Sequence, residues 1–311
     1  MRDYSFYKGK RVFITGHTGF KGSWLCRILL GLGADVTGYS LEPPTNPNLF
    51  NLADIELSMH SVIGDIRDFK FLKKAFDESQ PEIVLHLAAQ PIVRESYIHP
   101  AYTYETNVMG TVNILECIRL SQCVKSFLNV TTDKVYYNNE WEWGYRENEP
   151  MGGYDPYSSS KGAAEIAIAS WRRSFFHPEQ YEKHGKSIAS VRAGKVIGGG
   201  DWALDRIIPD CIKALEAGKE IEIRSSKAIR PWQHVLEPLS GYMLLALRMW
   251  KEPIKYCEGW NFGPRAESIS TVWDVASRVV ESFGCGELRD LSDPNALHEA
   301  DLLMLDISKV K

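Results

Sequence analysis

Short apolar runs alternate with longer segments of helical periodicity between the N-terminus and residue 192. Runs of the first kind predict buried strands, and segments of the second kind predict helices. Strands that alternate with helices in this way predict an α/β fold with a doubly wound parallel sheet of the Rossmann type. The predicted strands lie at 12–14, 34–39, 61–65, 82–90, 125–130 and 188–192, and the predicted helices at 24–32, 68–76, 102–120 and 157–176.

Beyond residue 192 the pattern changes, and helices there alternate with shorter strands. We interpret 1–192 as a cofactor-binding domain, and 193–311 as mainly a smaller mixed α/β lobe that binds a substrate and is interleaved with the first. The predicted helices of this second part lie at 204–217, 238–250 and 272–283, and its strands at 221–223 and 260–262.

Three glycines follow the first predicted strand directly, and an apolar helical segment follows them. The spacing of Gly16, Gly19 and Gly22 lets the chain turn sharply, approach a pyrophosphate and pack the helix closely on the strand. The helix N-terminus adds free N–H groups and a positive dipole end. The stretch therefore predicts a dinucleotide site, although a turn that serves only packing shares this pattern.

Two further strand ends favour a cofactor site less specifically. Asp65 ends the third predicted strand, where an acid faces the ligand crevice, and it is equally compatible with a structural turn. Ala88 and Ala89 end the fourth strand, where small residues admit either a flat ligand or plain close packing. No acid stands at the tip of the second strand and no arginine follows it at once, so the sequence leaves the choice between NAD and NADP open.

The candidate chemistry lies at the next strand end and on the helix predicted at 157–176. Thr132, Asp133 and Lys134 follow the strand at 125–130. A solvated loop also carries such residues, but a doubly wound sheet places its chemistry here. Tyr157 and Lys161 are one helical turn apart and share a face. We expect the ammonium to lower the pKa of the phenol, which makes Tyr157 a candidate general base.

Two predicted helices, 102–120 and 157–176, carry apolar residues on more than one side and need cover on two sides. The sheet covers one side, and a second copy of the chain is the cover we expect for the other, so we predict a homodimer. Thr106 and Asn107 lie in the middle of the first helix, where polar side chains need a partner.

The composition excludes several classes of function. The chain has 311 residues, 44% of them hydrophobic, and a net charge of -4, which indicates a soluble globular protein without a nucleic-acid or membrane-binding surface. The cysteines form no C-x-x-C pair and the histidines show no metal-ligand spacing, so we expect free thiols, a cytoplasmic protein and no metal. The first residues lack the apolar core of a signal peptide, and none is expected.

Three motifs together resemble the extended short-chain dehydrogenase/reductase family: T-G-H-T-G-F-K-G at 15–22, T-T-D-K at 131–134 and Y-S-S-S-K at 157–161. Longer strings resemble the nucleotide-sugar 4,6-dehydratases of that family that act on CDP-glucose. These strings include G-D-I-R-D at 64–68, A-A-Q-P at 88–91, V-I-G-G-G-D-W-A at 196–203 and I-R-P-W-Q-H-V at 229–235, and the resemblance spans essentially the whole chain.

The resemblance implies an NAD-dependent dehydration of CDP-glucose: oxidation at C4, loss of water across C5 and C6, and return of hydride to C6. It implies that Tyr157 takes the proton of the C4 hydroxyl, that Thr132 hydrogen-bonds the C4 oxygen and that Lys161 binds the nicotinamide ribose. It also implies Asp133 as the general acid on the C6 hydroxyl and Lys134 as the base at C5. A related dehydratase, a 4-epimerase or a non-catalytic NAD-binding protein remain the alternatives.

The remaining site residues are also implied by the resemblance. In this reading Arg230 meets the pyrophosphate of the substrate, and Lys195 stands where the family has asparagine, which leaves the fit of the substrate open. Family members continue past Lys311, so the lobe is expected to be incomplete or the protein short. The expected NAD contacts are Gly16, Thr18, Gly19, Phe20, Lys21, Gly22, Asp65, Ile66, Ala88, Ala89, Gln90, Thr106, Tyr157 and Lys161, and the expected substrate contacts Arg94, Lys195, Arg230, Trp232, His234 and His298.

Overall fold

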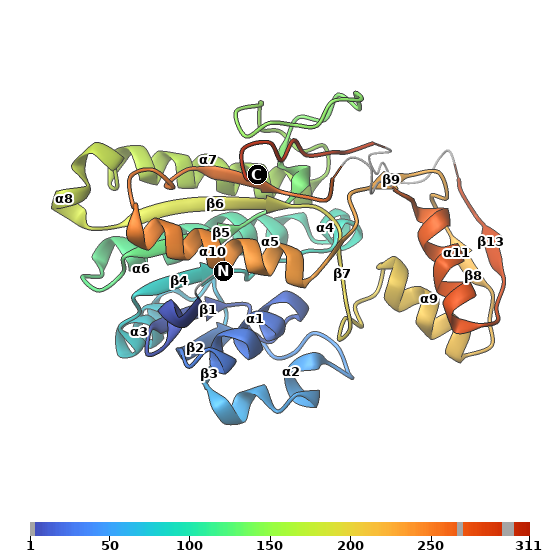
Figure 1. The fold of residues 1–311 in the computed structure, drawn as a ribbon, viewed down its shortest axis with the longest axis horizontal. Coiled ribbons are helices and arrows are strands. Elements are labelled where there is room, and N and C mark those ends of the chain that lie inside the picture. The colour runs from blue at the N-terminus through green and yellow to red at the C-terminus, as the bar shows by residue number, and fades with distance from the viewer. Residues whose placement is uncertain (1–3, 266–269, 294–301) are drawn as a thin grey trace.

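The computed structural model describes residues 4–265, 270–293 and 302–311 of the chain. A seven-stranded sheet forms its centre (Figure 1), and all neighbouring strands in it are parallel. The order β11-β6-β5-β4-β1-β2-β3 reverses direction at β1 and confirms the predicted doubly wound sheet. The strands are β1 (Arg11–Thr15), β2 (Asp35–Ser40), β3 (His60–Ile63), β4 (Ile83–His86), β5 (Ser126–Val130), β6 (Ser187–Ala193) and β11 (Gly259–Phe262).

Helices cover both faces of this sheet. Successive residues of a strand point to opposite faces, and in β1 Val12 and Ile14 pack in one apolar cluster with Leu25, whereas Phe13 packs in another with Phe76. The first cluster joins the sheet to α1 (Phe20–Gly31) and α10 (Leu236–Lys251), and the second joins it to α3 (Phe69–Ser79), α6 (Gly110–Leu120) and α7 (Pro156–Ser174).

The helix predicted at 102–120 is continuous but contains a π-helical turn, η3 (Glu105–Met109), between α5 (Pro100–Tyr104) and α6. Asn107 lies in this turn and finds the partners that its polar side chain requires. Its Nδ2 donates to the Gln90 carbonyl at 3.1 Å and its Oδ1 accepts from the Gln90 N–H at 2.9 Å. The turn thereby fixes the chain just after β4.

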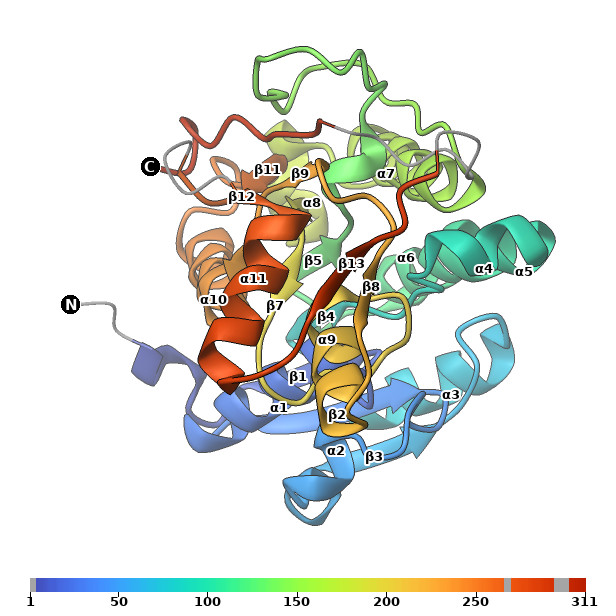
Figure 2. The same ribbon diagram turned by 90° about the vertical axis from the view of Figure 1, so that its right-hand side faces the viewer.

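A smaller lobe lies beyond one end of the sheet, and Figure 2 shows it in front of the strands. Its helices are α9 (Ile207–Glu216) and α11 (Val272–Phe283), and its parallel strands are β8 (Ile221–Ile223) and β13 (Leu288–Asp290). Cys211, Leu215, Ile221, Ile223 and Ala276 form its own small core.

Two elements predicted for the lobe lie in the main body instead. Helix α10 packs on the sheet, and β11 pairs with β6 so that Trp260 stands beside Val191. Periodicity defines the type of an element but not its partner, which is why the sequence misplaced both.

The remaining elements are short. They are η1 (Tyr4–Tyr7), α2 (Leu49–Leu52), η2 (Ile55–Ser58), α4 (Val93–Ile98), η4 (Asp133–Val135), η5 (Pro178–Gln180), α8 (Tyr181–His184), β7 (Val196–Ile197), β9 (Ile229–Arg230), β10 (Gln233–His234) and β12 (Ser270–Thr271). None of the described helices is both long and apolar enough to cross a membrane.

Candidate active site

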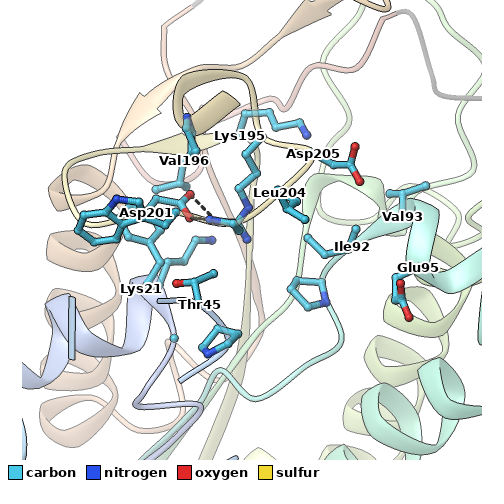
Figure 3. Close-up of a pocket in the computed structure, with 18 of the residues that line it drawn as sticks. Lys21, Thr45, Ile92, Val93, Glu95, Lys195, Val196, Asp201, Leu204 and Asp205 are labelled. Carbon is cyan, nitrogen blue, oxygen red and sulfur yellow. Dashed lines mark hydrogen bonds and ion pairs between the residues drawn. The ribbon is translucent and has the colours of Figure 1, made fainter. Parts of the chain in front are cut away.

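A cavity of about 1960 Å³ follows the carboxyl ends of the strands and extends to the smaller lobe. Figure 3 shows Lys21 and Asp201 on one side of it and Val93 and Glu95 on another. The carboxyl edge is where open α/β sheets bind their ligands. Every residue that the sequence assigned to the cofactor, from Gly16 to Lys161, lines this cavity.

The three glycines of the turn have two different roles, close packing of the turn and access for a ligand. A Cβ on Gly16, whose φ is +76°, would lie 2.7 Å from the Ala88 nitrogen, and a Cβ on Gly22 would lie 2.0 Å from the Gly16 oxygen. A Cβ on Gly19 would meet only the Gly16 oxygen, at 3.5 Å. Gly16 and Gly22 therefore hold the turn together, and Gly19 leaves the start of α1 open to the cavity.

The second strand is joined to this turn by a threonine. The Thr18 hydroxyl lies 2.6 Å from the Ser40 hydroxyl and donates to the Leu41 carbonyl at 2.8 Å. The cavity wall at this end includes Ser40 and Glu42. An exposed acid, two residues beyond β2, thus lines the region in which the sequence lacked an acid at the strand tip.

Asp65 serves a local turn and also lines the cavity. Its carboxylate accepts hydrogen bonds from the backbone and the guanidinium of Arg67, the latter at 2.6 Å, and these bonds lower its pKa. Arg67 also pairs with Glu105 at 3.1 Å. Both interpretations of Asp65 that the sequence allowed are therefore compatible with its position.

A buried hydroxyl faces the cavity from the π-helical turn. Thr106 lines the cavity and is buried, and its Oγ1 has no hydrogen-bond partner in the part of the chain that the structure describes. Buried polar groups are paired in most proteins, and an orphan at a π-turn is typical of a ligand site. The fourth strand ends beside it, with Ala88 and Ala89 in the cavity wall.

The predicted catalytic residues meet at the end of β5. Thr132 donates from its hydroxyl to Asp133 Oδ1 at 2.9 Å and accepts from the Lys134 N–H at 3.4 Å. The Tyr157 and Thr132 side chains are also within hydrogen-bond distance of each other. Lys161 donates to the Val130 carbonyl at 3.3 Å, so the two segments that carry these residues are in direct contact.

Burial has the largest effect on the pKa values of Tyr157 and Lys161. It raises the pKa of Tyr157 to about 12, against the opposing hydrogen bond from Thr132. It lowers the pKa of Lys161 to about 8, and the nearby charge of Lys21 acts in the same direction. The expectation that Lys161 lowers the pKa of Tyr157 is therefore wrong for this structure, because the loss of solvent outweighs the helical spacing of the pair.

Several charged residues that were not predicted from the sequence stand in the same cavity, among them Arg206 and Asp205. Arg206 pairs with Asp201 at 2.6 Å, and its charge opposes the rise in the pKa of Tyr157. Asp205 pairs with Arg94 of α4 at 3.5 Å and with Arg224 of the lobe at 2.6 Å. The signal that could have revealed them is the segment D-W-A-L-D-R at 201–206, which carries three charged residues directly after a glycine-rich loop.

The predicted substrate contacts divide into three groups. Arg94, Lys195, Arg230 and Trp232 line the cavity. His234 is not part of the cavity wall; it is exposed on β10, where its Nδ1 accepts from the Leu236 N–H at 3.3 Å, so its prediction as a substrate contact is not supported. His298 lies outside the described residues.

An open parallel sheet, a glycine turn after its first strand and a Tyr–Lys helix against the end of β5 define the class of protein. These features place the chain among nucleotide-binding proteins with the short-chain dehydrogenase/reductase fold. The family model described as GDP-mannose 4,6 dehydratase matches residues 13–257, and the chain belongs to this family.

Relatives named as nucleotide-sugar 4,6-dehydratases agree with this placement. The chain is 55% identical, over 309 residues, to a CDP-glucose 4,6-dehydratase from Salmonella typhimurium, which covers 99% of this chain and 86% of the relative. It is 30% identical to a probable dTDP-glucose 4,6-dehydratase from Sinorhizobium fredii, over 94% of this chain and 80% of the relative. The predicted family is thereby confirmed.

Solved structures confirm the fold. A dTDP-glucose 4,6-dehydratase from Bacillus anthracis in complex with NAD superposes with a TM-score of 0.78 at 20% identity, over 96% of this chain and 88% of that chain. One from Streptomyces venezuelae, with NAD bound, gives a TM-score of 0.80 at 23% identity, over 96% and 89%.

Proposed function

We propose that the protein is an NAD-dependent dehydratase that converts CDP-glucose to CDP-4-dehydro-6-deoxyglucose. The observation that carries the proposal is the meeting of Thr132, Asp133, Tyr157 and Lys161 in one cavity of a chain 55% identical to a CDP-glucose 4,6-dehydratase. A 4-epimerase needs a tyrosine and a lysine but no acid–base pair for loss of water. Asp133 and Lys134 in the cavity wall therefore favour the dehydratase.

The first step is removal of the C4 hydroxyl proton. Tyr157 is the base we propose, with Thr132 holding the C4 oxygen beside it. The phenol can take a proton only as phenolate, so the neighbouring positive charge of Arg206 has to offset the cost of burial. NAD, when bound, supplies the acceptor and later the donor of the hydride.

The second step is loss of water across C5 and C6. Once C4 is a ketone, the C5 proton is acidic, and we propose that Lys134 removes it. Asp133 is the proposed donor of a proton to the departing C6 hydroxyl. It is buried, accepts from Thr132, and lies one residue from Lys134, so acid and base reach one sugar ring from the same turn η4.

The residues at the carboxyl edge of the sheet fit NAD. The open surface at Gly19 and the start of α1 suit a pyrophosphate. The unpartnered Thr106 hydroxyl offers a polar contact, and Lys161 is proposed for the nicotinamide ribose. Structural neighbours solved with NAD add support for the choice of cofactor.

The diphosphate and nucleoside of the substrate are proposed to lie toward the smaller lobe. Arg206 and Arg230 line that part of the cavity and carry the planar guanidinium that suits phosphate oxygens. Lys195 and Arg94 add positive charge along the same wall. Trp232 donates from its indole nitrogen to the Ser270 carbonyl at 3.0 Å, and its ring face remains a candidate for stacking.

We also propose a cytoplasmic homodimer that supplies deoxysugars for a surface polysaccharide such as O-antigen. Exposed apolar side chains on the two helices predicted to pair, among them Tyr104, Met109 and Ile166, support self-association. All six cysteines are free, which suits a reducing compartment.

A product assay tests the proposal. The protein is incubated with CDP-glucose and, in parallel, with dTDP-, UDP- and GDP-sugars, and the products are analysed by mass spectrometry and NMR. We expect a 4-keto-6-deoxy sugar, lighter by one water, from CDP-glucose. Unchanged CDP-glucose beside turnover of another nucleotide sugar would refute the substrate, and an epimer without loss of water would refute the reaction.

A further inference from the structure

A buried carboxylate stands one helical turn beyond the Tyr–Lys pair. Tyr157, Lys161 and Glu165 follow one another at i, i+4 and i+8 and share a face of α7. All three are buried, and the reaction steps proposed above leave Glu165 without a role. Charged side chains in such positions are rare unless they are paired.

The face contacts consecutive residues at the end of β5. The Lys161 ammonium donates to the Val130 carbonyl at 3.3 Å. The Thr131 hydroxyl donates to Glu165 Oε1 at 2.6 Å. The strand end is thus attached to α7 at two successive residues, directly before Thr132.

Glu165 is held as a carboxylate by a dense set of donors. Arg192 on β6 binds it with two nitrogens, at 3.0 and 2.9 Å, and Ser190 donates to its Oε2 at 2.7 Å. Its pKa is lowered by Arg192 and by these hydrogen bonds, which together outweigh its burial. The same guanidinium donates to the Tyr136 hydroxyl at 2.7 Å, so the arrangement spans α7, β5, β6 and the segment after η4.

We propose that Glu165 is a positioning residue of the dehydratase: it anchors the end of β5 on α7 and places its carboxylate charge one helical turn behind the Lys161 ammonium. The proposal rests on the proposed function, because it acts through Lys161 and the side chains at 132–133. Glu165 itself touches neither of the reacting groups. Unlike an ion pair that only stabilises the fold, Glu165 acts on Lys161 through its negative charge and not only through its hydrogen bonds.

The charges around Lys161 give the proposal its direction. Lys21 reaches it from α1 and, with burial, lowers its pKa to about 8, whereas Glu165 raises it. His86 faces it from β4 and is itself kept neutral, because burial and Lys161 lower the pKa of that imidazole to about 3. Tyr157, one turn away on α7, is neutral in its ground state because burial raises its pKa. Loss of the negative charge of Glu165 should therefore leave Lys161 less protonated near neutral pH.

The first experiment measures the titration of Lys161 directly. Lysine side chains labelled with ¹³C and ¹⁵N are followed by NMR in the protein without cofactor, and the Lys161 signal is assigned with Lys161→Met. In Glu165→Gln, which keeps the length and an acceptor but loses the charge, we expect the pKa of Lys161 to fall by about one unit or more. The alkaline limb of the kcat profile on CDP-glucose should move to lower pH by a similar amount.

Two control variants separate charge from geometry. Glu165→Asp keeps the charge and shortens the side chain, so it should lower Tm while leaving the Lys161 titration within a few tenths of a unit of the wild-type value. Glu78→Gln makes the same chemical change on the exposed face of α3, where its pair with Lys74 is 4.0 Å long, and should change neither titration nor activity.

A neutral double variant covers the case in which Glu165→Gln does not fold, since it leaves Arg192 buried without its partner. In Glu165→Gln combined with Arg192→Gln both charges are absent, and the pKa of Lys161 should still fall. A folded variant of either kind with an unchanged Lys161 titration overturns the proposal. The NMR titration needs no turnover, so failure of CDP-glucose as a substrate is recognised separately, by the product assay.

Discussion

One added methyl group should have different consequences for stability and for NAD binding at two glycines of the nucleotide turn. In Gly22→Ala the new Cβ would lie 2.0 Å from the Gly16 oxygen and 2.8 Å from the Gly16 carbon and the His17 Cα. These are backbone atoms of the same turn, so no flexible side chain can move aside. In Gly19→Ala the Cβ meets only the Gly16 oxygen, at 3.5 Å, and the backbone φ of -77° suits any residue.

The distances set the expected magnitudes. Overpacking typically costs about 1–3 kcal/mol, and a contact as short as that of Gly22→Ala against backbone belongs at about 3 kcal/mol. For a chain of this length that corresponds to a fall in Tm of about 5 °C. Gly19→Ala replaces an N-cap glycine by a poorer cap and should cost less than about 1 kcal/mol.

The assay combines thermal unfolding without cofactor and calorimetric titration with NAD. Gly22→Ala should melt early, and its binding of NAD should weaken because the turn is displaced. Gly19→Ala should melt almost like the wild-type protein and yet bind NAD at least tenfold more weakly, about 1.4 kcal/mol, because its methyl group stands where the pyrophosphate approaches α1.

The predictions for Gly19→Ala and Gly22→Ala can be refuted independently. Unchanged NAD affinity in Gly19→Ala would mean that the pyrophosphate does not bind at this turn. An unchanged melting temperature in Gly22→Ala would mean that the first turn of α1 does not pack against Gly16 as closely as the structure has it. Gly31→Val serves as a steric control, because a Cβ added at Gly31 would meet nothing within 4 Å. This variant adds more bulk at an unhindered site and should not affect NAD binding.

Three further predictions concern charged residues of the cavity. Asp133→Asn should still oxidise CDP-glucose at C4 but slow the loss of water by about 100-fold or more, seen as accumulated NADH absorbance; full activity would contradict the acid role. Lys21→Met should raise Tm at pH 7, because burial lowers the pKa of Lys21 to about 8 in the folded protein. Between about pH 8 and 10.5 the folded state binds fewer protons than the unfolded state, so the wild-type protein gains stability as pH rises and the advantage of the variant should shrink. An advantage that does not depend on pH would contradict this reasoning. Asp205→Asn should raise KM for CDP-glucose several-fold with little change in kcat, since its pairs with Arg94 and Arg224 link body and lobe; an unchanged KM would show that this link does not contribute.

The sequence predicted best those features that depend on residues close together in the chain. The β1–turn–α1 unit follows from an apolar run, three glycines and an amphipathic segment, and its contacts are local. The N-cap of α3 is equally local, because the Asp68 side chain accepts from the Phe71 N–H at 3.0 Å. Residue spacing alone was therefore enough to predict the glycine turn at the carboxyl edge of the sheet.

Features that depend on long-range pairing were out of reach. The role of the segment 201–206 was not predicted from the sequence, because only the folded chain brings Arg206 and Tyr157 into one cavity. The apolar segment of α10 has the same periodicity whether it covers the sheet or the lobe. His234 lies only four residues from Arg230 in the sequence, yet Arg230 on β9 is buried and His234 on β10 is exposed.

The pKa values of the Tyr–Lys pair could not be predicted from the spacing of the two residues alone. An i, i+4 phenol and ammonium predict a lowered tyrosine pKa when the pair is considered in water, but burial acts on both groups at once and favours the neutral form of each. That is why the pKa of Tyr157 rises to about 12 while that of Lys161 falls to about 8. A base at this position consequently depends on charges outside the Tyr–Lys pair: Glu165, one turn further along α7, raises the pKa of Lys161, and Arg206 adds a positive charge from the loop before α9. The motif thus predicts the reacting groups, whereas the residues packed around it decide whether those groups are in the ionisation states that the chemistry needs.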